Sequence, residues 1–214
     1  MKRSTITFSE AAVVSAMCFG LFIVWSTEAV LAGFPEAKFS TSSNTWTIVV
    51  EVLLAASTLF YLYVRKFDIR SLYPEPSLAG TLWGLGVFVA AWVVGAIATS
   101  PFASVEHPLQ TEFSYARVSL ASTIVFAMVN GAFEEVFLLG VLVRGLRGYG
   151  LSVAMGVPLL VRVLYHLYQG PLGAVWVLAF GLTFTLFYVR KRLLWPPVLA
   201  HILWDIVPVI AAAA

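Results

Sequence analysis

Three hydrophobic segments of the chain each contain a pair of ionisable residues. The pairs are Glu134 and Glu135, Arg162 and His166, and His201 and Asp205. The residues of the second and third pairs are four positions apart, so each of these pairs lies on one face of a helix. A charged side chain in the middle of a membrane helix costs about 2.5 to 3.5 kcal/mol. We therefore predict that these residues are kept for use and form one functional site.

These residue types suit the activation of water. A carboxylate shielded from solvent holds a proton more readily than one in water, which makes it a usable general base near neutral pH. Neutral imidazoles facing it can hold the water or donate a hydrogen bond to a developing oxyanion, as peptide hydrolysis requires. Zinc is the alternative, because glutamate and histidine also bind zinc. The chain has no His-Glu-x-x-His motif, so we predict a site without a metal or other cofactor and leave zinc open.

The composition indicates an integral membrane protein. The chain has 214 residues, of which 60% are hydrophobic and 11% charged, and its mean hydropathy is +0.91. In soluble domains about a quarter of the residues are charged. The net charge of +2 is small, and no basic tract with interleaved aromatic residues occurs, which argues against a nucleic-acid partner. The single cysteine, Cys18, excludes an intramolecular disulfide.

Seven hydrophobic stretches are close to the length of about 17 to 25 residues that spans the hydrocarbon core, although the fifth is marginal. The expected helices cover residues 9–33, 46–64, 78–99, 117–144, 151–169, 172–188 and 196–213. We expect the first to be a retained helix and not a cleaved signal sequence, because the hydrophobic run continues for about twenty residues. The predicted fold is therefore an all-α polytopic transmembrane bundle that forms one domain over residues 1–214.

The basic residues predict the orientation of this bundle, because cytoplasmic connections carry the excess of lysine and arginine. Ten of the thirteen lie in the N-terminus and in every second connection: Lys2, Arg3, Arg65, Lys66, Arg70, Arg144, Arg147, Arg190, Lys191 and Arg192. We therefore place the N-terminus in the cytoplasm. Glu28 and Glu51 then fall near the opposite ends of their helices, where we expect them to reach the surface or pair with Lys38.

The polar motifs resemble those of the CPBP family, which includes the type II CAAX prenyl endopeptidases, the bacterial Abi proteins and bacteriocin-processing proteins. The matching segments are Glu134-Glu135-Val-Phe-Leu-Leu-Gly-Val-Leu, Arg162-Val-Leu-Tyr-His166-Leu-Tyr-Gln-Gly, and His201-Ile-Leu-Trp-Asp205. They lie within residues 117–213, the motif-bearing core. The first three helices contribute nothing to the resemblance.

The resemblance implies an intramembrane endopeptidase in which the first glutamate of the pair, Glu134, activates water. It further implies that His166 and His201 orient the water and stabilise the oxyanion. Asp205 falls where the family has Asn or Asp. An ionised Asp205 can only accept hydrogen bonds, so we expect it to orient His201 or to be protonated.

One position departs from the family pattern Glu-Glu-x-x-x-Arg, because Leu139 replaces the arginine. That arginine would be the partner of Glu135 four residues earlier in the helix. Arg162 is the cation available within the membrane, and we predict that it takes over this pairing. A second difficulty is depth, since straight helices would not bring His166 level with Glu134. We expect residues 150–157 to be irregular, with the fifth helix starting near Pro158.

The leading interpretation is a multi-pass protease of a bacterial cell membrane that cleaves a peptide or protein, with or without a lipid, entering from the cytoplasmic side. Two alternatives stay open. One is a catalytically silent partner, such as an immunity or scaffolding protein, that keeps the polar residues for folding. The other is a small transporter that uses them as a proton relay, although the chain lacks the paired broken helices of an inverted repeat.

Overall fold

The computed structural model describes residues 3–102, 111–115 and 118–213 and confirms the predicted all-α bundle. Within these residues the α-helices are α1 (Phe8–Leu31), α2 (Thr41–Val64), α3 (Leu78–Thr99), α4 (Leu120–Glu135), α5 (Leu151–Tyr165), α6 (Gly170–Lys191) and α7 (Trp195–Ala213). Short polar side chains begin several of them. Thr7, Ser40, Ser77 and Ser119 each accept a hydrogen bond from a backbone N–H of the first turn, which satisfies a donor that has no partner within the helix.

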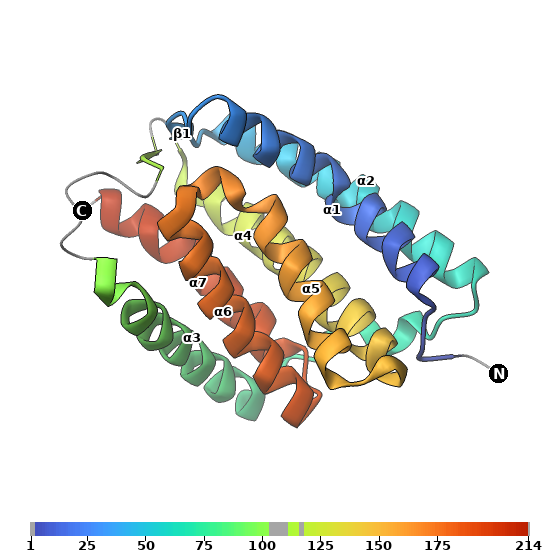
Figure 1. Ribbon diagram of the computed structural model, residues 1–214. Coiled ribbons are helices and arrows are strands. Elements are labelled where there is room, and N and C mark those ends of the chain that lie inside the picture. The colour runs from blue at the N-terminus through green and yellow to red at the C-terminus, as the bar shows by residue number, and fades with distance from the viewer. Residues whose placement is uncertain (1–2, 103–110, 116–117, 214) are drawn as a thin grey trace.

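The helices lie side by side along a common direction. α1 and α2 form one edge of the bundle and α3 the opposite edge, with the remaining helices between them (Figure 1). α4 packs against α2 and α7, while α3 packs against α6 and α7. The motif-bearing helices therefore occupy the middle of the bundle.

Five segments have the length and hydropathy to cross a membrane: Phe8–Leu31, Thr41–Val64, Leu78–Phe102, Leu120–Val143 and Leu167–Lys191. α5 and α7 are apolar but shorter. The protein is thus a multi-pass integral membrane protein. The fifth predicted helix, whose hydrophobic stretch was marginal in length, is one of the two shorter helices.

The basic connections gather at one end of the bundle, which we call the basic end. Backbone hydrogen bonds join Arg3 to the connection after α2 and join Ile6 to Gly145. The Glu10 carboxylate forms ion pairs with Arg3 and Arg65 at this end. At the opposite end, strand β1 (Ala37–Lys38) pairs in parallel with strand β2 (Phe113–Ser114). The alternate connections therefore lie together, as the charge pattern predicted.

The predicted helix over 117–144 is continuous from Leu120 to Val143, but its second half is not an α-helix. α4 ends at Glu135 and continues as a π-helix, η3 (Val136–Val143). In a π-helix the backbone bonds run to the fifth residue, so the spacing from Glu135 to Leu139 no longer has the register of an α-helix. Leu139 is fully buried among apolar side chains of α3, α6 and α7. π-helical turns occur often at functional sites.

The expectation that residues 150–157 are irregular is also wrong. α5 is helical from Leu151 and contains Pro158 in its interior. The depth difficulty is resolved at the other end of the helix, because α5 has only 15 residues whereas α1 and α2 have 24 each. At about 1.5 Å per residue, α5 stops well short of the full length of the bundle. His166, which caps it, therefore lies inside the bundle.

Candidate active site

A buried ion pair joins α4 to α5. Arg162 Nη2 lies 2.8 Å from both carboxylate oxygens of Glu135, so the contact predicted from the substitution at Leu139 is present. Both side chains are excluded from solvent, and the Arg162 guanidinium also lies over the Phe180 ring at 5.2 Å. Gly181 leaves room for it, because a Cβ at that position would lie 2.7 Å from Arg162 Cδ. Arg162 of α5 thus pairs with Glu135 in place of the family arginine, whose position is Leu139 in this chain.

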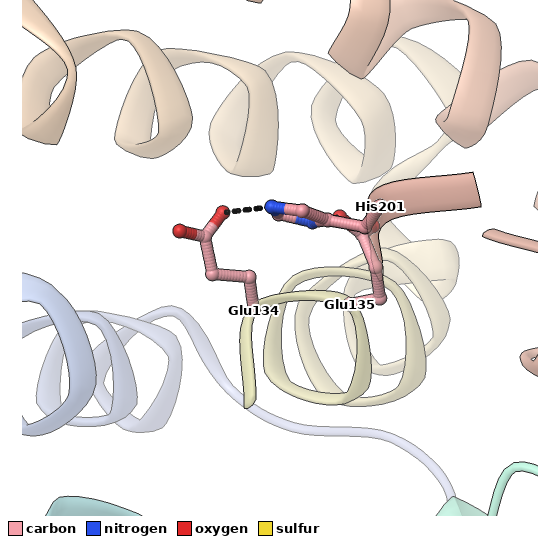
Figure 2. Close-up of side chains that lie close together, drawn as sticks. All are labelled: Glu134, Glu135 and His201. Atoms are coloured by element: carbon pink, nitrogen blue, oxygen red, sulfur yellow. Dashed lines mark hydrogen bonds and ion pairs between the residues drawn. The ribbon is translucent and has the colours of Figure 1, made fainter. Parts of the chain in front are cut away.

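His201 connects this ion pair to the first glutamate. Its Nδ1 lies 2.6 Å from Glu135 Oε1, and its Nε2 lies 3.9 Å from Glu134 Oε2. Figure 2 shows the ring, carried by α7, lying beside α4 with Nε2 directed at the Glu134 carboxylate. Because a carboxylate only accepts, Nδ1 carries the proton of the shorter contact. Glu135 therefore fixes the orientation of His201.

Asn130 belongs to this cluster and escaped the sequence-based prediction. Its Nδ2 donates to Asp205 Oδ2 at 3.0 Å and lies 3.4 Å from His201 Nε2. Asp205 Oδ1 is 3.8 Å from the same ring nitrogen. Asn130 stands one helical turn before Glu134, so its spacing on α4 was the signal that could have identified it. We expected Asp205 to orient His201, but the hydrogen-bond contact to the ring comes from Glu135, and Asp205 lies farther away.

Glu134 has a different environment from Glu135. Tyr165 Oη donates to Glu134 Oε2, whereas Arg162 Nη1 is 3.7 Å away. The Tyr165 ring stacks on Phe19 at a centroid distance of 4.9 Å, which ties α1 to the site. Tyr165 is thus a direct hydrogen-bond partner of the first glutamate.

His166 lies next to Tyr165, with a ring-centroid distance of 4.4 Å. Its Nδ1 is 3.0 Å from the backbone oxygen of Arg162, and since a carbonyl only accepts, Nδ1 is the protonated nitrogen and Nε2 is free to accept. His166, Glu134, His201 and Asp205 all line one cavity, which has a volume of about 870 Å³. The structure therefore brings together all the predicted site residues, with His166 in the wall of the same cavity as Glu134, His201 and Asp205.

The cavity opens toward the end of the bundle opposite the basic end. Its outer lining includes Pro35, Glu36 and Lys38 from the connection after α1 and Val207 and Pro208 near the end of α7, and all five residues are exposed. Aromatic side chains make up much of the wall: Phe22, Phe88, Trp92, Phe126, Trp176 and Trp204. If the basic end lies in the cytoplasm, as the charge pattern predicts, this opening faces the noncytoplasmic side, opposite to the expected entry of the substrate.

Glu51 also lines the cavity, contrary to the expectation that it would reach the surface or pair with Lys38. Its side chain is buried, and its Oε2 has no hydrogen-bond partner among the described residues. Lys38 forms its ion pair with Glu36 instead, at 3.5 Å. The reason is that Ser40 caps α2, which begins at Thr41 and not near residue 46. Glu51 therefore lies deeper in the helix than the sequence suggested.

An unpaired buried carboxylate is costly, so Glu51→Met is expected to stabilise the protein by about 1 to 3 kcal/mol. The measurement is the thermal unfolding midpoint of the purified protein in one detergent. Glu28→Met is the matched control, because Glu28 is exposed on α1 and its replacement should change the midpoint little. A lower midpoint for Glu51→Met than for the wild type would mean that Glu51 has a stabilising partner.

The geometry also bears on zinc. Ligand atoms of Glu134, Glu135 and His201 lie within 4.8 Å of one another, which is compatible with a metal ion. The Arg162 guanidinium, however, lies 2.8 Å from Glu135 and 3.7 Å from Glu134. A dication placed between these carboxylates would stand next to a fixed positive charge. The charge already present therefore favours a water molecule over a metal ion beside Glu134.

Comparison with known proteins agrees with the motifs. Residues 116–207 match the family model described as type II CAAX prenyl endopeptidase Rce1-like. The matched region contains the polar residues around Glu134, namely Asn130, Glu135, Arg162, Tyr165, His166, His201 and Asp205. No curated protein and no solved structure matches the chain.

Proposed function

We propose, from the match of residues 116–207 to the Rce1-like family of type II CAAX prenyl endopeptidases, that the protein hydrolyses a peptide bond with water activated by Glu134. The family supports an intramembrane protease in general. The observation that carries the finer proposal is the contrast between the two glutamates. Glu135 is engaged by Arg162 and His201, whereas Glu134 faces the cavity.

Water is held in this mechanism between the Glu134 carboxylate and the free Nε2 of His166. Glu134 removes a proton as the water oxygen attacks the peptide carbonyl carbon, and the carbonyl electrons move to oxygen. The same proton is then passed to the leaving nitrogen as the carbon–nitrogen bond breaks. The products are a carboxylic acid and an amine, which become a carboxylate and an ammonium group by proton exchange, and Glu134 returns to its starting state.

The negative charge that develops on the carbonyl oxygen is stabilised by hydrogen-bond donors next to Glu134. The Asn130 amide donates there, and so does His201 Nε2 when the ring carries both protons. Three carboxylates lie within 4 Å of the His201 ring, those of Glu134, Glu135 and Asp205. Donors aimed in advance at a developing oxyanion are among the largest contributions to catalysis of acyl transfer.

The test is cleavage of a library of internally quenched peptides by the purified protein, with and without a strong chelator. We expect cleavage that persists in the chelator and falls by about 10²- to 10⁴-fold in His166→Ala. Cleavage lost with the chelator and restored by zinc would assign the reaction to a metal. Equal cleavage by the wild type and His166→Ala would exclude this site as its source, and the silent-partner alternative would then stand.

We further propose that the substrate enters from the noncytoplasmic side, because the cavity mouth lies opposite the basic end and basic connections stay in the cytoplasm. Such a position favours a peptide or membrane protein presented at the outer surface over a cytoplasmic lipidated C-terminus.

Labelling of introduced cysteines in intact cells measures this orientation. A membrane-impermeant maleimide is expected to modify Lys38→Cys at the mouth and to spare Arg70→Cys at the basic end. The native Cys18 is fully buried, so the unmodified chain is the blank, and permeabilised cells show that both introduced thiols can react. Labelling of Arg70→Cys with protection of Lys38→Cys would reverse the orientation.

A further inference from the structure

A second cavity lies at the basic end, away from the candidate active site. It has a volume of about 560 Å³, within the range of roughly 300 to 1,000 Å³ typical of ligand sites. Its charged lining consists of four arginines and one glutamate: Arg70, Arg144, Arg147, Arg192 and Glu75. The excess of positive charge points to an anionic ligand.

Two of the arginines are held in place by neighbours. Arg144 donates to Ser71 Oγ, lies over the Phe67 ring at 5.5 Å and forms an ion pair with Asp68 at 3.9 Å. Arg147 Nη2 donates to the backbone oxygen of Val189 at 3.2 Å. A guanidinium has five N–H donors, so these contacts leave others free. Arg70 and Arg192 are exposed, and within the described parts of the chain neither forms an ion pair. The cavity thus combines two fixed cations with two uncommitted ones.

The polar lining fits a phosphate group. Hydroxyl side chains of Ser4, Thr5, Ser77 and Tyr188 share the cavity with the arginines. Ser77, which caps α3, and Trp195, the first residue of α7, border it as well, and the dipole at a helix N-terminus favours negative charge. Retention of basic loops in the cytoplasm requires only charge, so it does not account for a cavity built in this way.

Exposed apolar side chains also lie on α3, which begins beside the cavity at Ser77. Leu78 is 80% exposed and Leu82 63% exposed, in the first turns of a helix long and apolar enough to cross the membrane. Trp195, whose Nε1 donates to Thr81 at 3.0 Å, lies in the cavity wall beside this surface. A free phosphate would leave the surface unused, whereas a phospholipid would place its acyl chains along it.

We propose that this cavity binds the headgroup of an anionic phospholipid from the leaflet at the basic end. The arginines hold the phosphate, and the acyl chains lie against the exposed leucines of α3. Basic cavities between membrane helices are suited to anionic headgroups for this reason.

Binding to the delipidated protein can be measured by native mass spectrometry with phosphatidylglycerol, phosphatidylcholine or inorganic phosphate as the probe. The double variant Arg70→Gln/Arg192→Gln removes the two uncommitted cations, and Lys66→Gln/Arg190→Gln is the matched control that removes two exposed charges outside the cavity. We expect the wild type to prefer phosphatidylglycerol. The first variant should lose affinity for it by roughly thirtyfold, while the control changes little.

Two results would overturn the proposal. Equal losses in the two double variants would mean that general surface charge, and not this cavity, attracts the lipid. Equal binding of phosphatidylglycerol and phosphatidylcholine, or binding of inorganic phosphate as tight as that of phosphatidylglycerol, would exclude an anionic-lipid site. Unchanged helical circular dichroism and thermal midpoints would show that the variants are folded.

Discussion

Replacement of Arg162 by methionine is expected to destabilise the protein by about 3 to 5 kcal/mol, because it leaves the Glu135 carboxylate buried without its cation. Methionine is chosen because it keeps most of the side-chain length in a space closed by Gly181 and Phe180. Unfolding in one detergent, followed by heat or denaturant, gives the difference in the free energy of unfolding between variant and wild type.

A double variant distinguishes the effect of losing the charge of Arg162 from the effect of losing its packing. Arg162→Met/Glu135→Gln removes both charges, so it should recover a large part of the stability lost in Arg162→Met. Arg190→Met is the control for arginine removal, since Arg190 is exposed on α6 and its replacement should have little effect. A double variant no more stable than Arg162→Met alone would show that the ion pair is not what Arg162 contributes.

The main features of the fold follow from a few rules of membrane insertion. Hydrophobic lengths give the helices, and the alternation of basic connections groups them at one end, because each helix reverses the direction of the chain. The polar pairs on three helices also meet as predicted, since side chains this costly in lipid are directed into the bundle. The pairing of Arg162 with Glu135 follows from the same reasoning, as a buried anion needs a cation.

The features that escaped prediction depend on details that hydropathy does not contain. The start of α2 is set by the Ser40 cap, which makes the polar run after it helical and carries Glu51 inward. The π-helix after Glu135 and the early end of α5 are set by tertiary packing. Asn130 was missed because a neutral amide gives no insertion penalty comparable to that of a charge, although it shares a face of α4 with Glu134.

The largest effect on activity is expected for Glu134→Gln. The amide keeps the size of the side chain and can still accept from Tyr165, but it cannot take a proton from water, so peptide cleavage should fall by about 10³-fold or more. The thermal midpoint should not fall, because the charge removed lies beside the cavity while the pair between Arg162 and Glu135 is untouched.

The most direct measurement of the central claim is the cleavage rate of Glu134→Gln relative to Glu51→Gln, with the same peptide and in the presence of a chelator. Both variants convert a buried carboxylate of one cavity into an amide, so general effects of lost charge are shared between them. If Glu134 activates the water, Glu134→Gln loses cleavage and Glu51→Gln keeps a rate within about threefold of the wild type. A wild-type rate in Glu134→Gln, or equal losses in the two variants, would contradict the assignment of Glu134 as the base.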